Sequence, residues 1–150
     1  MLAEKFGMEY TDADGQKKNP YIIHRTSIGC YERTLALLIE KYAGAFPTWL
    51  APVQVKFLPI ADRHQDYCRE MMQKLSDAGV RCEFDDRSEK IGFKIRSAQM
   101  EKIPYMILVG DKDIEANTIS VRSRKNGDEG ATTIDEFVKR VKEEIDTKAR

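Results

Sequence analysis

The residues of this 150-residue sequence best suited to metal binding or nucleophilic catalysis are its two histidines and three cysteines. His64 and Cys68 are four residues apart, a spacing that places both on one helix face within reach of one zinc ion. Two ligands do not complete a zinc site and no second pair lies nearby, so we expect an exposed histidine and a half-buried cysteine. His24, beside Arg25 at the end of an apolar run, is by itself typical of a structural histidine. The sequence contains neither a phosphate-binding glycine loop nor a nucleophile elbow.

A charged segment over residues 85–96 indicates binding of an anionic or polar ligand. It begins where a strand is expected to end and a helix to begin, the edge at which parallel sheets carry their binding sites. Free amides at a helix N-terminus attract anions, and Lys90, Lys94 and Arg96 continue along the expected helix. A solvated, charged helix face explains the same pattern equally well. Arg33, inside an otherwise apolar helix, is likewise explained by a salt bridge to a neighbouring glutamate.

The C-terminal two thirds of the chain contains alternating strand and helix patterns. These elements must position His64, Cys68 and the charged segment 85–96. Asp62 is expected to cap the first helix of this region, and Thr133 with Glu136 forms a capping box for the last one. Strand–helix–strand alternation indicates right-handed crossovers and a largely parallel sheet with helices on its faces. The expected strands are 53–58, 80–84, 104–109 and 118–124, and the expected helices begin near residues 62, 91 and 134.

The N-terminal third is expected to be a small appendage. A turn at 12–15 between apolar runs at 5–10 and 20–24 predicts a hairpin. Apolar residues at helical spacing predict a helix from Tyr31 to Tyr42. The proline-rich linker that follows divides the chain into residues 1–47 and 48–150, and the shorter piece is too small to bury a core of its own.

Composition narrows the functional classes. Twenty-five Lys and Arg residues balance twenty-five Asp and Glu residues, which excludes a basic protein that holds nucleic acid through net charge alone. No apolar run approaches the roughly 20 residues of a membrane span, and the first residues do not form a secretory signal. Three unpaired cysteines argue against a disulfide framework. We therefore expect a cytoplasmic protein with no membrane partner.

The segment NPYIIHRTSIGCYERTLALLIEKYAGAFPTWLAPVQV resembles motif 3 of class II aminoacyl-tRNA synthetases as it runs into their anticodon-binding domain. Its HR, G and ER elements, followed by FPTWLAPVQV, are most similar to the threonyl-tRNA synthetases. The downstream segments EKIGFKIR, IPYM, GDK and VRSR agree with that family in the same order. The resemblance covers nearly the whole chain. It implies an α/β fold: a mixed, mostly parallel sheet of about five strands with helices on both faces, preceded by a hairpin and helix remnant of the antiparallel catalytic domain.

The resemblance also implies roles for residues in the N-terminal third. Arg33 matches the motif 3 arginine, a catalytic residue that contacts the phosphates of ATP, which the parent enzyme uses with Mg²⁺. His24 matches one ligand of the Zn²⁺ ion that holds the amino and hydroxyl groups of threonine. Cys30 takes a position in the threonine pocket where relatives often carry a small polar residue.

Four residues of the C-terminal part match anticodon contacts of the family: Ser88, Arg96, Asp113 and Arg122. Charged and hydroxyl side chains can hydrogen-bond the pairing edges of unstacked bases. Relatives commonly carry Asn and Glu where this chain has Ser88 and Asp113, and both replacements keep hydrogen-bonding capacity. Arg96, on a helix, and Arg122, on a strand, converge only if the sheet places them on one face.

The implied parent is a threonine–tRNA ligase that binds tRNA(Thr) and forms a homodimer through a catalytic domain absent here. Motifs 1 and 2 and the other zinc ligands are not in this sequence, so we expect the chain alone to be catalytically inactive. The alternative is a stand-alone RNA-binding regulatory protein built on the same domain. A third possibility, a small flavodoxin-like enzyme, fits the strand–helix alternation and accounts for none of the motifs.

Overall fold

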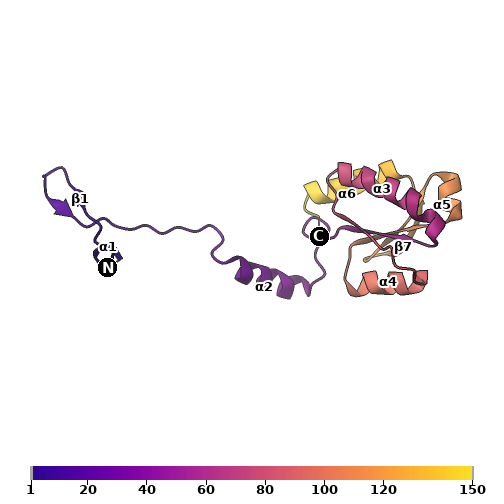
Figure 1. The fold of residues 1–150 in the computed structure, drawn as a ribbon, viewed down its shortest axis with the longest axis horizontal. Helices are drawn as coiled ribbons and strands as arrows, with labels where there is room; N and C mark the ends of the chain where they lie inside the picture. Colours follow the sequence, from indigo (N-terminus) through magenta and orange to yellow (C-terminus); the bar gives the residue numbers. More distant parts are fainter. Residues whose placement is uncertain (1, 150) are drawn as a thin grey trace. The chain divides into compact units, whose positions relative to one another are not determined.

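The structure, a computed structural model, describes residues 2–149 and divides into two units (Figure 1). The first unit ends at Ala36 and the second begins at Leu37, so the division falls within one helix. The predicted division after residue 47 lies close to it and stays a prediction. None of the described helices is long and apolar enough to cross a membrane.

The first unit contains a hairpin, but its strands differ from those expected. The short helix α1 (Leu2–Lys5) precedes β1 (Tyr10–Thr11), which pairs antiparallel with β2 (Lys17–Lys18). The expected strand at 20–24 does not form, because its side chains have no sheet to pack on: Tyr21 and Ile23 are each 88% exposed. Pairing is instead confined to the turn, where the Lys18 ammonium group contacts two turn aspartates.

Helix α2 (Tyr31–Tyr42) forms over the predicted residues. It ends at Tyr42, and two residues later Gly44 has a φ of +76°, which suits glycine, and its N–H donates to Ile39 O over 3.1 Å. None of the residues of α2 is buried, and Leu35, Leu37 and Ile39 are each about half exposed or more. The apolar face of this helix therefore buries little surface and adds little to the stability of the chain.

We expect the amides of α2 to exchange with solvent far faster than those of strand β5 (Tyr105–Val109). Amide protection depends on cooperative packing, and β5 is almost wholly buried whereas α2 is not. Native-state hydrogen exchange read by mass spectrometry on the monomeric chain measures the difference. Equal protection of residues 31–42 and 105–109 would contradict it.

The second unit is built on a five-stranded sheet in the order β4-β3-β5-β6-β7. The parallel strands β3 (Val55–Pro59), β4 (Cys82–Phe84) and β5 come first along the chain. Strand β6 (Ile119–Ser123) runs antiparallel to β5 and to β7 (Gly127–Thr132), so four of the five strands point the same way. The predicted mixed, mostly parallel sheet is confirmed. Strand β7 was not predicted, because its glycines and charged residues have low strand propensity.

Helices cover both faces of this sheet, as predicted (Figure 1). On one face, α3 (Gln65–Asp77) and α6 (Ile134–Asp146) bury Leu75, Phe137 and Val141 against the strands. On the other, α4 (Ile91–Met100) buries Ala98 against Leu58 and Met106. The predicted capping box of α6 is present, with Thr133 Oγ accepting from the Glu136 amide. A 3₁₀ turn, η1 (Asp62–His64), leads into α3, and the polar helix α5 (Asp111–Ala116) was not predicted.

Candidate nucleic-acid interface

Charged side chains gather where the parallel strands β3, β4 and β5 end. Lys94, on α4, is 5% exposed, and its ammonium group donates to Pro59 O and Asp85 O, each over 3.3 Å. Pro59 is the last residue of β3 and Asp85 directly follows β4, so the lysine fastens the helix to both strands. The predicted charged segment 85–96 therefore lies at the sheet edge where parallel folds bind ligands.

Asp85 and Arg87 form an ion pair at this edge. The Asp85 side chain is 1% exposed, and its Oδ1 accepts from Arg87 Nε over 2.9 Å while Oδ2 accepts from the Arg87 NH2 group. The hydrogen-bonded guanidinium holds the pKa of Asp85 below its usual value. The Arg87 side chain remains 43% exposed, so it is held in one orientation at the surface.

We expect Asp85→Asn to destabilise the second unit by about 1.5–3 kcal/mol at neutral pH, the range for hydrogen bonds to charged groups. Because the folded pKa is depressed, the stabilisation is present above the unfolded value near pH 4 and is lost as pH falls through the folded pKa. Urea unfolding of both proteins between pH 7 and pH 2.5 measures this. A stability difference that stays constant across that range would contradict the assignment.

His64 and Cys68 are both buried, so the expectation of an exposed histidine and a half-buried cysteine was wrong. His64 Nδ1 accepts from the Ala61 amide over 3.1 Å, and Nε2 lies 3.0 Å from Asp111 Oδ1. The imidazole thus joins η1 to the start of α5, a contact invisible in the sequence because 47 residues separate the partners. Burial raises the pKa of the Cys68 thiol to about 12. Among residues 2–149 no group of three His, Cys, Asp or Glu side chains is placed to hold a metal.

Ser88 lies on the rim of an open cavity of about 360 Å³ at this edge. The cavity is lined by the loop that joins β3 to η1, by the loop between β4 and α4, and by Lys94 of α4. Its charged lining residues are Arg87, Lys90 and Lys94 together with Asp62 and Glu89. No side chain caps the N-terminus of α4, where Lys90 is the N-cap residue. Three cations against two carboxylates, beside a helix N-terminus without a side-chain cap, favour an anionic ligand such as a phosphate.

Arg122 and Asp113 lie on the α4 side of the sheet. Arg122 on β6 is opposite Met106, and Ser120 is opposite Leu108, so all four side chains share the face that α4 partly covers. Asp113 is 8% exposed and accepts from the Ser120 hydroxyl over 2.7 Å and the Gly110 amide over 2.8 Å. Its carboxylate is therefore fixed against β6.

The Nε–H of Arg122 is buried and has no hydrogen-bond partner among the described residues. A buried donor without an acceptor costs about 1–3 kcal/mol, so it is an exception that calls for a ligand or a water molecule. Met106 packs with Ala98 of α4, and among the described strands α4 packs mainly on β3 rather than on β6 or β7. Arg122 thus lies on the part of the sheet that α4 does not cover, and its buried Nε–H lacks a partner within the described chain.

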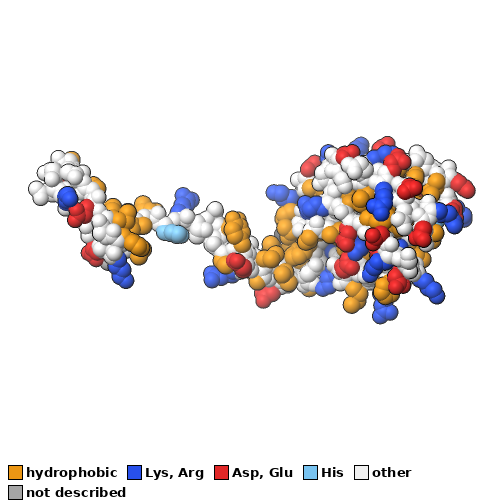
Figure 2. Space-filling view, in the orientation of Figure 1, with side chains coloured by type: hydrophobic (Ala, Val, Ile, Leu, Met, Phe, Trp, Pro, Cys, Tyr) orange, Lys and Arg blue, Asp and Glu red, His pale blue; other side chains and the backbone are white. Residues whose placement is uncertain are grey.

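The four predicted anticodon-contact residues are brought to one side of the sheet. Ser88 and Arg96 belong to the edge loop and the exposed surface of α4, and Asp113 and Arg122 to α5 and β6. Arg96 and Arg122 therefore lie on the same side of the sheet, and their convergence on one RNA loop stays a prediction. Surface charge does not single out the site, since acidic and basic side chains are interspersed on the face shown in Figure 2.

In the first unit, the predicted catalytic-domain residues His24 and Cys30 lie outside helices and strands, and Arg33 lies in α2. His24 and Arg33 are exposed, and Arg33 forms no ion pair within residues 2–149, so the alternative salt bridge to a neighbouring glutamate is absent there. The half-buried Cys30 thiol donates to Glu32 over 2.8 Å.

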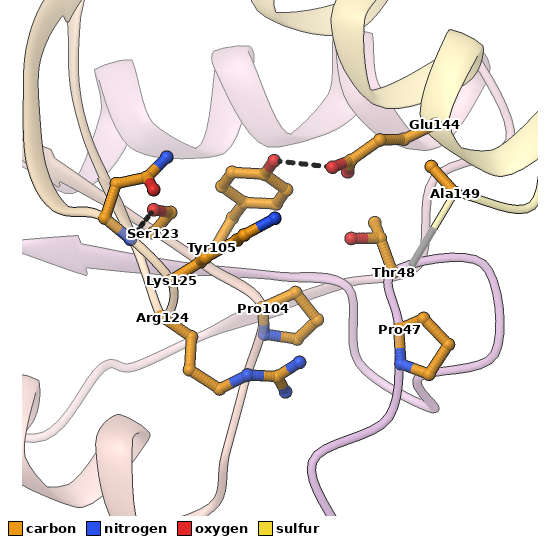
Figure 3. A pocket seen from close by; sticks show the side chains of 10 residues that line it. Pro47, Thr48, Pro104, Tyr105, Ser123, Arg124, Lys125, Glu144 and Ala149 are labelled. Atoms are coloured by element: carbon orange, nitrogen blue, oxygen red, sulfur yellow. Dashed lines mark hydrogen bonds between the residues drawn. The ribbon is translucent and has the colours of Figure 1, made fainter. Parts of the chain in front are cut away.

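A further cavity of about 200 Å³ lies at the other end of the parallel strands, where β5 begins (Figure 3). The Tyr105 hydroxyl there donates to Glu144 Oε1 over 3.1 Å, and burial raises the pKa of Tyr105, so the phenol stays a neutral donor. None of the predicted site residues lines this cavity.

An α/β fold whose sheet carries polar side chains on a partly uncovered face is suited to binding unstacked bases. Residues 52–144 match the anticodon binding domain, and the chain belongs to that family. It is 61% identical over 149 residues to a threonine–tRNA ligase of Clostridium botulinum (strain Eklund 17B) and 49% identical over 148 residues to that of Caldanaerobacter subterraneus. Each alignment covers 99% of this chain and 23% of the relative, so the chain spans about a quarter of these ligases.

Among solved structures, the RNA-binding domain of threonyl-tRNA synthetase from Cryptosporidium parvum superposes with a TM-score of 0.73 at 27% identity. That match covers 95% of this chain and 36% of the other. The resemblance predicted from the sequence is thereby confirmed. The family assignment also rules out the flavodoxin-like enzyme considered above.

Proposed function

We propose that this chain is the anticodon-reading part of a threonine–tRNA ligase and that its second unit binds the anticodon loop of tRNA(Thr). The observation that carries the proposal is the buried, unpartnered Nε–H of Arg122 on the open part of the sheet. The threonine–tRNA ligases that match over 99% of the chain support it and favour it over a stand-alone regulatory protein.

Each candidate residue offers a distinct contact to an unstacked base. Arg122 and Arg96 donate from planar guanidinium groups, which pair with a guanine edge in a bidentate manner or stack on a base. Ser88 has a freely rotating hydroxyl at the cavity rim. Asp113 Oδ1 already accepts from Ser120 but retains a second lone pair for a base amino group.

The parent ligase would use the first unit for a different purpose. Arg33 would contact the phosphates of ATP, bound with Mg²⁺, because a guanidinium can stabilise negative charge on a transferring group. His24 would be one ligand of a Zn²⁺ ion, and its exposed imidazole suits that role. Cys30 would line the threonine pocket. The proposed parent acts in the cytoplasm as a homodimer formed through its catalytic domain.

We expect no threonine-dependent ATP–pyrophosphate exchange from this chain alone. A catalytic zinc site needs three protein ligands, and residues 2–149 provide no cluster of that size. The assay uses purified chain with threonine, ATP, Mg²⁺ and labelled pyrophosphate, with a full-length threonine–tRNA ligase as positive control. Exchange above the no-enzyme background would contradict the expectation.

The test of anticodon binding is a fluorescence anisotropy titration with a labelled anticodon stem-loop. The wild-type chain should bind a stem-loop with a threonine anticodon more tightly than one of the same length with all three anticodon bases changed. Equal affinity for both would overturn the proposal, because zero net charge leaves only local contacts to provide binding.

A further inference from the structure

One large aromatic side chain on α4 points away from the protein. Phe93 is 52% exposed, although it lies one turn into a helix whose opposite face packs on the sheet through Lys94 and Ala98. Arg96 and Met100 follow at spacings of three and four residues, so they lie on the same outward surface. Phe93 therefore contributes little to the core, and its exposure needs another explanation.

One cation, Arg87, lies beside the Phe93 ring. The guanidinium carbon of Arg87 lies 5.6 Å from the ring centre, within the range of a cation–π contact. The Asp85 carboxylate holds that guanidinium through two hydrogen bonds, so its position beside the ring is set by a buried group. Ser88 and Lys90, between Arg87 and Phe93 in sequence, line the adjacent cavity.

We propose that Phe93 is a stacking residue on which one base of the bound RNA loop lies, with Arg87 and Lys90 beside it near the RNA backbone. This inference rests on the proposed anticodon function and adds a residue to that site. Exposed aromatic and guanidinium planes are the surfaces on which proteins stack unpaired bases, and neighbouring cations favour a polyanion over an apolar protein partner.

The experiment compares Phe93→Ala, Phe93→Tyr and Phe93→Leu in the anticodon stem-loop titration. Base–aromatic stacking contributes about 1–3 kcal/mol, so Phe93→Ala should weaken binding about 5- to 150-fold. Phe93→Tyr should keep wild-type affinity, and Phe93→Leu, which is apolar but lacks a ring, should resemble Phe93→Ala. Met100→Ala is the matched control: Met100 is 76% exposed on the same helix surface, and its loss should change affinity less than twofold.

Stem-loops with an abasic site at each loop position in turn identify the stacked base. At one position, the abasic loop should bind wild type and Phe93→Ala equally, because the stacking partner is already gone. If no abasic position removes the effect of Phe93→Ala, or if Phe93→Leu binds like wild type, the stacking assignment is wrong.

The two proposals fail in different ways. Phe93→Ala binding as tightly as wild type, while the wild-type chain still selects the threonine anticodon, overturns the stacking role alone. Failure of the wild-type chain to select that anticodon overturns the proposed function itself. Thermal melting of each variant excludes misfolding, since truncation of a half-exposed side chain should leave the melting temperature nearly unchanged.

Discussion

Arg122→Ala is expected to weaken binding of a threonine anticodon stem-loop by about 5- to 150-fold, the equivalent of about 1–3 kcal/mol for an arginine that reads a base. The guanidinium of Arg122 is half-buried on β6, and its Nε–H has no partner within the described chain. The half-exposed guanidinium can pair with or stack on a base, and truncation removes that contact together with the planar group. Fluorescence anisotropy with purified variant and wild type measures the loss.

Lys142→Ala provides the control for nonspecific charge. Lys142 is exposed on α6, which covers the opposite face of the sheet from α4. Removing this charge should change affinity little, and any effect should shrink as salt is raised, because it acts through phosphate attraction. Equal losses for Arg122→Ala and Lys142→Ala would reduce the proposed site to a charged surface.

Phe137→Ala is expected to destabilise the second unit by about 3–5 kcal/mol, the range for truncation of a buried aromatic side chain. Phe137 is 1% exposed and meets the Tyr105 ring edge-on, with ring centres 5.4 Å apart. The Arg140 guanidinium also lies over both rings. The change therefore leaves a cavity and removes two ring contacts at once.

Urea unfolding followed by circular dichroism measures the effect of Phe137→Ala. Lys139→Ala, two residues along the same helix and exposed, is the matched control and should stay within about 0.5 kcal/mol of wild type. A loss below 1 kcal/mol for Phe137→Ala would show that α6 is not part of the core.

The elements that the sequence predicted are those with a strong local signal. Helix α6 has an apolar stripe and a Thr133–Glu136 capping box, and both features are present. Strand β5 is a continuous apolar run that only a strand buried on both faces would carry. These patterns depend on neighbours within one turn or one strand, so they can be read without the fold.

The elements that were missed depend on distant partners. Strand β7 contains two glycines and becomes a strand because β6 pairs with it, across a register shift at Val121 and Arg122. Helix α5 has six mostly polar residues, and the Asp113 carboxylate stabilises its start by accepting from Gly110. The N-terminal strands were misplaced because an alternating apolar pattern forms a strand only when a sheet is available to receive it.

The candidate site likewise has features with a local sequence signal and features that depend on distant partners. The charged edge at 85–96 was predicted because strand ends and helix starts have sequence signals. The ion pair of Asp85 with Arg87 was missed, and so was the exposure of Phe93. The only sequence signal for the contact between Arg87 and Phe93 is their separation of six residues. Burial of the Arg122 donor was beyond prediction, since it depends on the pairing of β6 between β5 and β7.

The most direct test of anticodon reading is a cycle that combines protein variants with loop variants. Wild type, Arg96→Ala and Arg122→Ala are each titrated with a threonine anticodon stem-loop and with loops that change one anticodon base at a time, at two salt concentrations. Each arginine variant should lose affinity for the threonine anticodon and should bind at least one single-base variant as well as wild type does. If both variants lose affinity equally for every loop, and the loss disappears at the higher salt concentration, these arginines contact phosphates and the anticodon-reading account is contradicted.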